Sequence, residues 1–315
     1  MDISLARLCQ REGAACADPD GDGVYARDDD AWRGIMTQFG YALAPPLASG
    51  ARTTGMRHFY LGLETSVVQL DDGAEYWANG TEGDRLSGVE RRNRFVDSVL
   101  TMTRLHLRKG LPWGLELGLS AGRIFNTSYW TWGASLKIAL MEGFREGLAA
   151  WVPDVAIRGS VQTLTGDDEF SLTVPSLDVV VSKPLVLGRA AVLTPILGAQ
   201  FVWIMADSES VDLSPGRDQW AECGNLVDRS GGSSEPWTLP SPACTGSVTD
   251  YGNETEFPRL RVFRSRLVVG FNFRYRLLQL GATIHWDLKS PSSDSDVPEG
   301  VNRQYNLTLV AGVVY

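Results

Sequence analysis

Residues 305–315 read YNLTLVAGVVY, and an apolar or aromatic residue occupies every second position of this stretch. Leu309 and Tyr315 belong to that apolar phase, whereas Asn306 and Thr308 belong to the other. A period of two is that of a β-strand, in which successive side chains point to opposite faces. The stretch therefore predicts a strand that is apolar on one face and ends at Tyr315.

The same period of two recurs in ten segments of the chain from residue 57 onwards. Each segment is long enough to cross a membrane as a tilted strand, which takes roughly 9–11 residues. The ten predicted strands are approximately 58–70, 98–108, 113–123, 130–141, 154–164, 170–182, 191–205, 260–275, 278–288 and 304–315.

The connections between these segments favour a membrane barrel. The three longest, 71–97, 206–259 and 289–303, are all odd-numbered, so in an antiparallel meander they lie at the same end. Outer-membrane barrels carry long loops outside and short turns on the periplasmic side, with aromatic residues at both strand ends. We therefore predict an all-β fold, a closed antiparallel up-and-down transmembrane barrel of about ten strands over residues 56–315. A soluble secreted β-sandwich also alternates and remains an alternative.

Composition supports this class of protein. The 315 residues are 43% hydrophobic with a mean hydropathy of -0.10, and no run of 18 apolar residues is present, which argues against a transmembrane helix. The net charge of -9 argues against nucleic acid as a partner, because nucleic acid selects basic surfaces.

The C-terminal stretch resembles the last strand of bacterial outer-membrane proteins, which the barrel-assembly machinery reads. The stretches GYALAPPLASGARTTG (40–55) and LHLRKGLPWGLELG (105–118) are similar to uncharacterised outer-membrane proteins of myxobacteria and related deltaproteobacteria. The resemblance implies a Gram-negative outer membrane, with both termini periplasmic and the long loops extracellular. It also implies two kinds of partner: membrane lipid with lipopolysaccharide, and the assembly machinery, reached through the strand that ends at Tyr315.

Residues 1–55 differ from the barrel and form a predicted N-terminal extension. Within it, residues 31–43 place Trp32, Ile35 and Phe39 at helical spacing, which predicts a short amphipathic helix. We expect the extension to lie in the periplasm or to plug the barrel. Because no export signal is visible at the start, we expect one to have been removed or to lie upstream.

The four cysteines form two local pairs, Cys9 with Cys16 and Cys223 with Cys244. Neither spacing matches a zinc site. Two disulfides are expected for an exported protein, and four free thiols are the alternative.

An acidic turn raises calcium as a candidate ligand, and no other cofactor is predicted. Asp18, Asp20 and Asp22 alternate before a glycine, and Asp29 occupies the twelfth position, as in calcium-binding loops. A solvated acidic turn without metal is the alternative.

Charged residues of both signs fall on the predicted inner face. They predict either a porin-like narrow channel for small solutes, in which Arg264, Arg266 and Arg274 favour anions, or a salt-bridged interior of a structural outer-membrane component. The predicted pore-lining residues are Glu64, Arg104, His106, Glu116, Lys137, Arg158, Asp178, Arg264, Arg266, Arg274, His285 and Asp287.

A catalytic alternative rests on His285 and Asp287, since a histidine oriented by a carboxylate suits general-base catalysis. Such a pair near the outer rim suggests an omptin-like protease or a lipid hydrolase, although omptins carry the pair in the reverse order. We expect no enzymatic activity as the first hypothesis.

The long connection 206–259 is expected to cap the pore or to bind a surface ligand.

Overall fold

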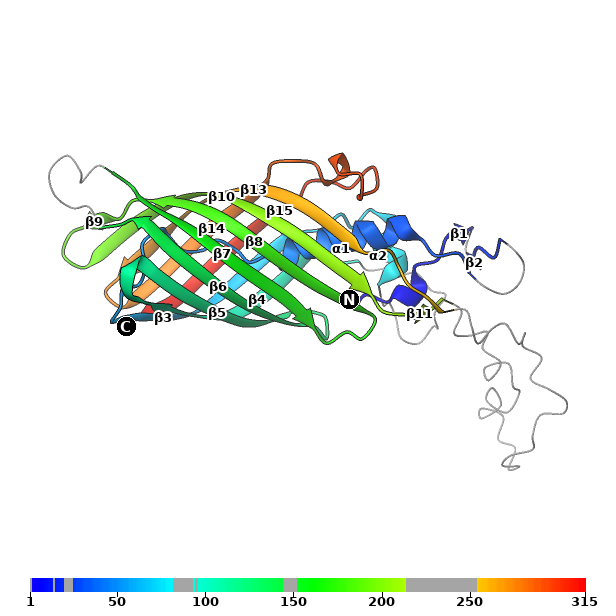
Figure 1. The fold of residues 1–315 in the computed structure, drawn as a ribbon, viewed down its shortest axis with the longest axis horizontal. Coiled ribbons are helices and arrows are strands. Elements are labelled where there is room, and N and C mark those ends of the chain that lie inside the picture. Colours follow the sequence, from blue (N-terminus) through cyan, green and yellow to red (C-terminus); the bar gives the residue numbers. More distant parts are fainter. Residues whose placement is uncertain are drawn as a thin grey trace, which may run out of the picture.

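The computed structural model describes residues 2–13, 15–19, 25–81, 93, 96–143, 152–213 and 254–315. Ten long strands form one sheet, and a three-residue strand, β9 (Leu185–Leu187), pairs with the start of β10 (Figure 1). The long strands are β3 (Phe59–Gln69), β4 (Val99–Gly110), β5 (Leu115–Ile124), β6 (Trp130–Met141), β7 (Asp154–Thr165), β8 (Phe170–Ser182), β10 (Ala191–Ser208), β13 (Leu260–Tyr275), β14 (Leu278–Asp287) and β15 (Tyr305–Val314).

The sheet closes on itself. Each long strand pairs with its neighbours in antiparallel fashion, and the last strand, β15, pairs with the first, β3. Next to this seam, Phe59 and Tyr315 exchange backbone hydrogen bonds of 2.8 and 2.9 Å. A closed sheet leaves no unpaired edge, so the predicted ten-stranded barrel is confirmed and the β-sandwich alternative is wrong.

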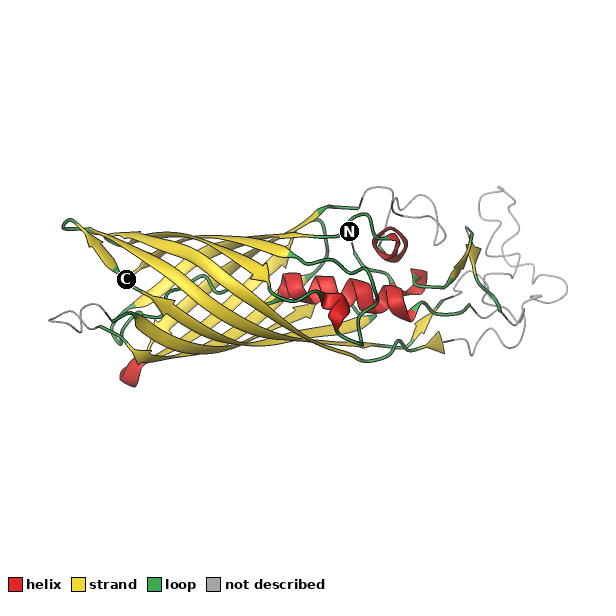
Figure 2. Ribbon diagram, turned by 90° about the horizontal axis from the view of Figure 1, so that it is seen from above, coloured by secondary structure: helices red, strands yellow, loops and turns green. Residues whose placement is uncertain are grey.

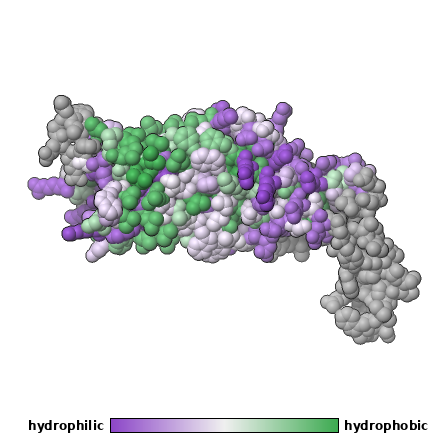
Figure 3. Space-filling model, in the orientation of Figure 1, coloured by the Kyte–Doolittle hydropathy of each residue, from purple (hydrophilic) through white to green (hydrophobic). Residues whose placement is uncertain are grey.

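The two faces of each strand have the predicted character. On β15, Leu307, Leu309 and Val313 are 39–50% exposed on the outside, whereas Asn306 and Thr308 are buried inside. Figure 3 shows apolar side chains gathered on the barrel wall and hydrophilic ones over the end where α1 and α2 lie. A wall that is apolar outside and polar inside is that of a membrane-spanning barrel. No described helix has the length and hydrophobicity needed to span a membrane.

The helices and short strands lie in the N-terminal region and in the connections. Helix α1 (Asp29–Leu43) is capped by Asp28, whose side chain accepts a 2.9 Å hydrogen bond from the backbone N–H of Ala31, and it ends before Pro45. The predicted helix is thereby confirmed. The other elements are η1 (Leu5–Arg7), β1 (Arg11–Glu12), β2 (Ala15–Cys16), α2 (Glu75–Gly80), η2 (Pro112–Gly114), β11 (Val211–Asp212), β12 (Glu254–Thr255) and η6 (Pro291–Ser293).

The described N-terminal residues and the C-terminus lie at opposite ends of the barrel (Figures 1 and 2). Ile3 pairs with Thr81, and Tyr129 donates a hydrogen bond to the carbonyl of Ile3, so the N-terminal residues contact the odd-numbered connections. Tyr315 lies at the other end, beside Phe59. We call these the long-loop end and the short-turn end.

This arrangement corrects one prediction, that both termini lie on the same side. An even number of strands places the two ends of the barrel wall together, but the segment before β3 runs back through the lumen. The chain enters from the long-loop end as α1, continues through residues 44–58 and starts β3 at the short-turn end (Figure 2).

Candidate functional site in the barrel lumen

Helix α1 fills the lumen towards the long-loop end. Its side chains Trp32, Ile35 and Phe39 are at most 2% exposed and pack in one cluster with inward-facing strand residues. On β10 these are Val202 and Ile204, both fully buried. Burying a large apolar side chain contributes roughly 1.5–3 kcal/mol relative to leaving it in water. The helix is therefore part of a protein core that the barrel encloses.

Beyond the helix, six charged side chains and one glutamine lie along one row of cross-strand neighbours. The row contains carboxylates and cations that pair across strands: Lys137 Nζ lies 2.8 Å from Glu116 Oε1, and Arg158 Nε lies 2.5 Å from Asp178 Oδ2. In order from β5 to β14, the row contains Glu116, Lys137, Arg158, Asp178, Gln200, Arg266 and Asp287.

The three cations of the row and Gln200 also hold the segment that follows α1. Arg158 Nη1 donates to the carbonyl of Pro46 at 2.9 Å, and Gln200 Nε2 donates to that of Pro45 at 2.8 Å. Lys137 Nζ donates to two further carbonyls of the segment, those of Gly50 and Arg52, each at 3.2 Å. An extended segment has no partners of its own for its backbone, so these donors satisfy groups that would be costly to bury alone.

Arg266 is the member of the row without an acidic partner. Its Nε donates to Gln200 Oε1 at 2.5 Å, and its Nη atoms donate to the carbonyls of Tyr41, Ala44 and Pro45. Among the ion pairs of the described residues, none includes Arg266. Dipoles are therefore its partners at hydrogen-bond distance, and the Asp178 carboxylate attracts its positive charge from farther away.

At the short-turn end the segment is held by Glu116. The backbone N–H of Thr54 donates to Glu116 Oε2 at 2.7 Å, and Arg108 approaches Oε1 at 3.7 Å. The Arg108 guanidinium also lies 3.9 Å from the centre of the Tyr60 ring, a cation–π contact. A Cβ on Gly110 would lie 2.3 Å from the carbonyl oxygen of Gly55, so glycine permits this close passage.

The twelve residues predicted to line a pore lie in this packed interior, with one exception. Glu64 pairs with Arg104 at 3.3 Å and lies 3.7 Å from His106, and Arg264 pairs with Asp287. The exception is Arg274, which is exposed near the end of β13. The interior thus consists of buried ion pairs and protein backbone, and several buried side-chain N–H groups in it have no partner among the described residues.

Several residues that hold this interior were not among the predicted ones, notably Arg108, Tyr60, Gln162 and Gln200. The period of two predicts that these side chains point inwards. It does not predict their partners, because the partners depend on the register between strands and on the course of residues 43–55.

The hydrolase alternative gains no support from the surroundings of His285 and Asp287. Both are fully buried. The Asp287 carboxylate pairs with Arg264, and His285 Nε2 lies 3.2 Å from Thr283 Oγ1, so the two side chains do not form a histidine–carboxylate pair. Arg264 also stacks on the ring of Tyr41, so helix α1 covers this region.

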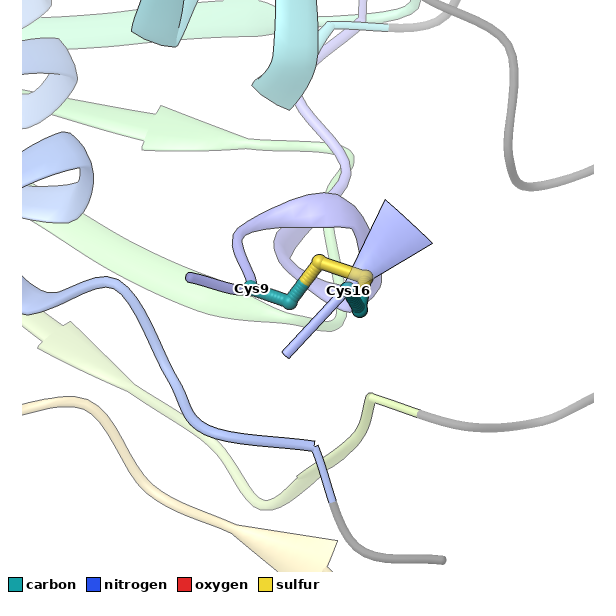
Figure 4. The surroundings of a disulfide bond; sticks show 2 residues. All are labelled: Cys9 and Cys16. Carbon is teal, nitrogen blue, oxygen red and sulfur yellow. A yellow bond between two sulfur atoms is a disulfide. The ribbon is translucent and has the colours of Figure 1, made fainter. Parts of the chain in front are cut away.

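One predicted disulfide is present near the N-terminus. Cys9 and Cys16 are bonded next to the small β1–β2 pair (Figure 4). The other predicted pair, Cys223 and Cys244, lies outside the described residues, as do Asp20 and Asp22 of the candidate calcium turn. Asp18 is described, and no group of metal-ligating side chains is found among the described residues.

The long connection 206–259 is described only at its two ends. There β10 continues to Ser208, and Val211 and Asp212 pair with Thr255 and Glu254. The predicted capping or ligand-binding role concerns residues 214–253, which lie outside the described residues.

No protein-family model and no curated protein matches this sequence. Among solved structures, the chain is similar to the N-terminal β-barrel domain of OprF from Pseudomonas aeruginosa, with 8% identity, 81% of this chain and 97% of that one covered, and a TM-score of 0.28. It is also similar to OprG from the same organism (9% identity, 85% and 99% covered, TM-score 0.28) and to Ail, the attachment invasion locus protein of Yersinia pestis (10%, 82% and 97%, TM-score 0.24). At these low values, the fold assignment rests on the strand pairing of the chain itself.

Proposed function

We propose that the protein is a structural component of a bacterial outer membrane, a closed barrel that anchors its own N-terminal segment at the cell surface. The observation that carries this proposal is the course of residues 29–58, which fill the lumen from the long-loop end to the short-turn end. This proposal gives the protein a location in the outer membrane, an orientation in it and a closed pore.

The apolar outer wall supports the membrane location. In hydrocarbon every backbone N–H and C=O needs a protein partner, which a closed barrel supplies. Exposed aromatic residues lie near both ends of the wall, Trp132 and Trp286 towards the long loops and Tyr275 and Tyr315 towards the short turns. This is the distribution that interfacial aromatic girdles have in outer-membrane barrels.

The packed lumen favours a structural role over a narrow channel. An open path would require α1 to leave, and its departure would expose inward-facing apolar side chains such as Met102, Val202 and Ile204 to water. It would also strip the partners from Arg158 and Arg266. For the same reason we propose no enzymatic activity.

The contacts at the long-loop end support the anchoring role. The backbone N–H of Ser4 donates to the carbonyl of Gly80 at 2.9 Å, and Arg27 donates to that of Glu256 at 2.8 Å. Tyr129 bonds both Ile3 and Asp167, and burial raises the pKa of the Asp167 carboxyl. The N-terminal segment is thereby attached to several loops.

We propose membrane lipid and lipopolysaccharide as partners of the outer wall, and the assembly machinery as the partner of the last strand.

Epitope accessibility on intact cells tests this orientation. One epitope is inserted after Gly13 and a matched one after Gly188; both glycines are exposed and have left-handed φ angles of 71° and 70°. We expect antibody to bind the Gly13 insertion on intact Gram-negative cells. The Gly188 insertion, at the short-turn end, should bind only after the outer membrane is permeabilised. Binding at Gly13 only after permeabilisation would contradict the proposal.

A further inference from the structure

A small cavity that several charged and polar side chains line lies in the lumen between the segment after α1 and strands β3 to β7. Its volume is about 20 Å³, which accommodates one small group, since a single water needs roughly 10–15 Å³ measured in this way. Pro45 and Pro46 form one side, and glycine and serine residues of β5 and β6 make room on the other. The lining residues used below are Glu64, Arg104, His106, Gly133, Arg158 and Gln162.

Three side chains that line this cavity have buried N–H groups without a partner among the described residues. These groups are Arg104 Nε, Arg158 Nη2 and Gln162 Nε2. The three side chains are at most 5% exposed, and each uses its other polar atoms elsewhere. Arg104 donates to Glu64 and to the carbonyl of Leu43, Arg158 to Asp178 and Pro46, and Gln162 Oε1 accepts from Ser120 at 3.4 Å. A buried donor left unpaired costs about 1–3 kcal/mol, more if it is charged.

The charges around the cavity leave an excess of one positive charge. Arg104 and Arg158 face Glu64 and Asp178, and Arg266, which has no acidic partner, is near enough to interact electrostatically with both arginines. Three cations against two carboxylates give 3 − 2 = +1. Water can accept hydrogen bonds from the three donors, but only an anion also balances this charge in a low-dielectric interior.

The backbone of β5 and β6 maintains the space. A Cβ on Gly133 would lie 2.4 Å from Gln162 Oε1 and 2.6 Å from Ser120 Oγ, so any larger residue would push Gln162 into the cavity. His106 lies beside the cavity and within 3.7 Å of Glu64, which keeps that carboxylate engaged. Glu64 is the one carboxylate in the lining, and its two oxygens face Arg104 and His106.

We infer that this cavity binds one small monovalent anion of the chloride class, with Arg104, Arg158 and Gln162 as donors. The site is independent of the proposed surface anchoring. Its role is structural: the anion joins β4 and β7 to the end of α1 and the segment after it, because Arg104 bonds Leu43 and Arg158 bonds Pro46. The folded barrel is therefore stabilised by binding in proportion to the logarithm of the anion concentration above its Kd.

The test uses the full chain folded in detergent micelles. The temperature at which the folded, heat-modifiable gel band disappears is measured in sodium chloride, sodium bromide and sodium gluconate at equal ionic strength, so that screening is the same. We expect higher midpoints in chloride and bromide, saturating with concentration, because gluconate is too large for the cavity. Equal midpoints in the three salts would overturn the inference and leave water as the occupant.

A pair of isosteric variants locates the effect. Gln162→Glu replaces a donor with a carboxylate and should raise the chloride concentration for half the shift by at least about tenfold. Asn306→Asp makes the same change in the lumen away from the cavity and should leave the halide shift unaltered. A halide shift that survives in Gln162→Glu would place the anion elsewhere and overturn the inference.

Crystals of the unaltered chain grown in sodium bromide give a readout that needs no variant to fold. We expect one bromide peak in the anomalous difference map between Arg104, Arg158 and Gln162. A map without a peak at that position would overturn the inference, whatever the variants do.

Discussion

Arg158→Met should lower the free energy of unfolding by about 3–5 kcal/mol, the usual cost of removing one partner of a buried ion pair. Asp178 is fully buried and loses its 2.5 Å partner, and the carbonyl of Pro46 loses its 2.9 Å donor. Guanidinium titration of the protein folded into lipid vesicles measures the change.

Two further variants separate this effect from a general sensitivity of the barrel to lost arginines. Arg274→Met, on an exposed arginine of β13, should stay within about 0.5 kcal/mol of the parent protein. The double variant Arg158→Met/Asp178→Leu removes both charges of this ion pair, so it should be more stable than Arg158→Met alone. A double variant as unstable as the sum of its two single variants would contradict the buried pair.

Leu309→Arg should destabilise the barrel by about 2–4 kcal/mol in lipid vesicles, the cost of an arginine at the bilayer midplane. Leu309 lies mid-strand on the outer face of β15 and is 50% exposed. On a water-soluble protein, the same change at so exposed a position would stay within about 0.5 kcal/mol.

The matched control is Leu288→Arg, because Leu288 is 51% exposed just beyond the end of β14. An arginine at the interface costs only about 0–1 kcal/mol. Equal and negligible effects at Leu309 and Leu288 would mean that the outer wall faces water.

The barrel was predictable from the sequence because each strand repeats one physical rule, a period of two with one apolar face. The ten predicted segments match the ten long strands closely: the last was predicted as 304–315 and is observed as Tyr305–Val314. The inward phase of charged residues followed from the same rule. Which charges meet, for instance Arg158 with Asp178, depends on register, which short-range patterns do not determine.

The course of the N-terminal segment was predicted only in part. The helix and a plugging role were among the expectations, but the direction of entry was not, because an amphipathic helix does not specify the surface that covers it. One signal was present. Phe201 to Met205 of β10 form a continuous apolar run, which indicates a strand covered on both faces. Lipid covers one face of such a strand, and protein must cover the other.

Disulfide trapping tests the threading of the lumen most directly. The test variant is Gly50→Cys with Ser182→Cys. A Cβ on Gly50 would lie 3.3 Å from Ser182 Cβ, close to the roughly 3.5–4.5 Å that a disulfide requires. Ser182 already accepts a 2.8 Å hydrogen bond from the backbone N–H of Ala51. The matched control pairs Gly50→Cys with Gly159→Cys, whose Cβ would have no neighbour within 4 Å on the outer face of β7.

After oxidation of the folded protein and alkylation of free thiols, mass spectrometry reports the linked peptides. A segment that runs through the barrel predicts a bond between positions 50 and 182 and none between 50 and 159. Free, alkylated cysteines at both 50 and 182 would contradict it, because the segment would then lie outside the lumen.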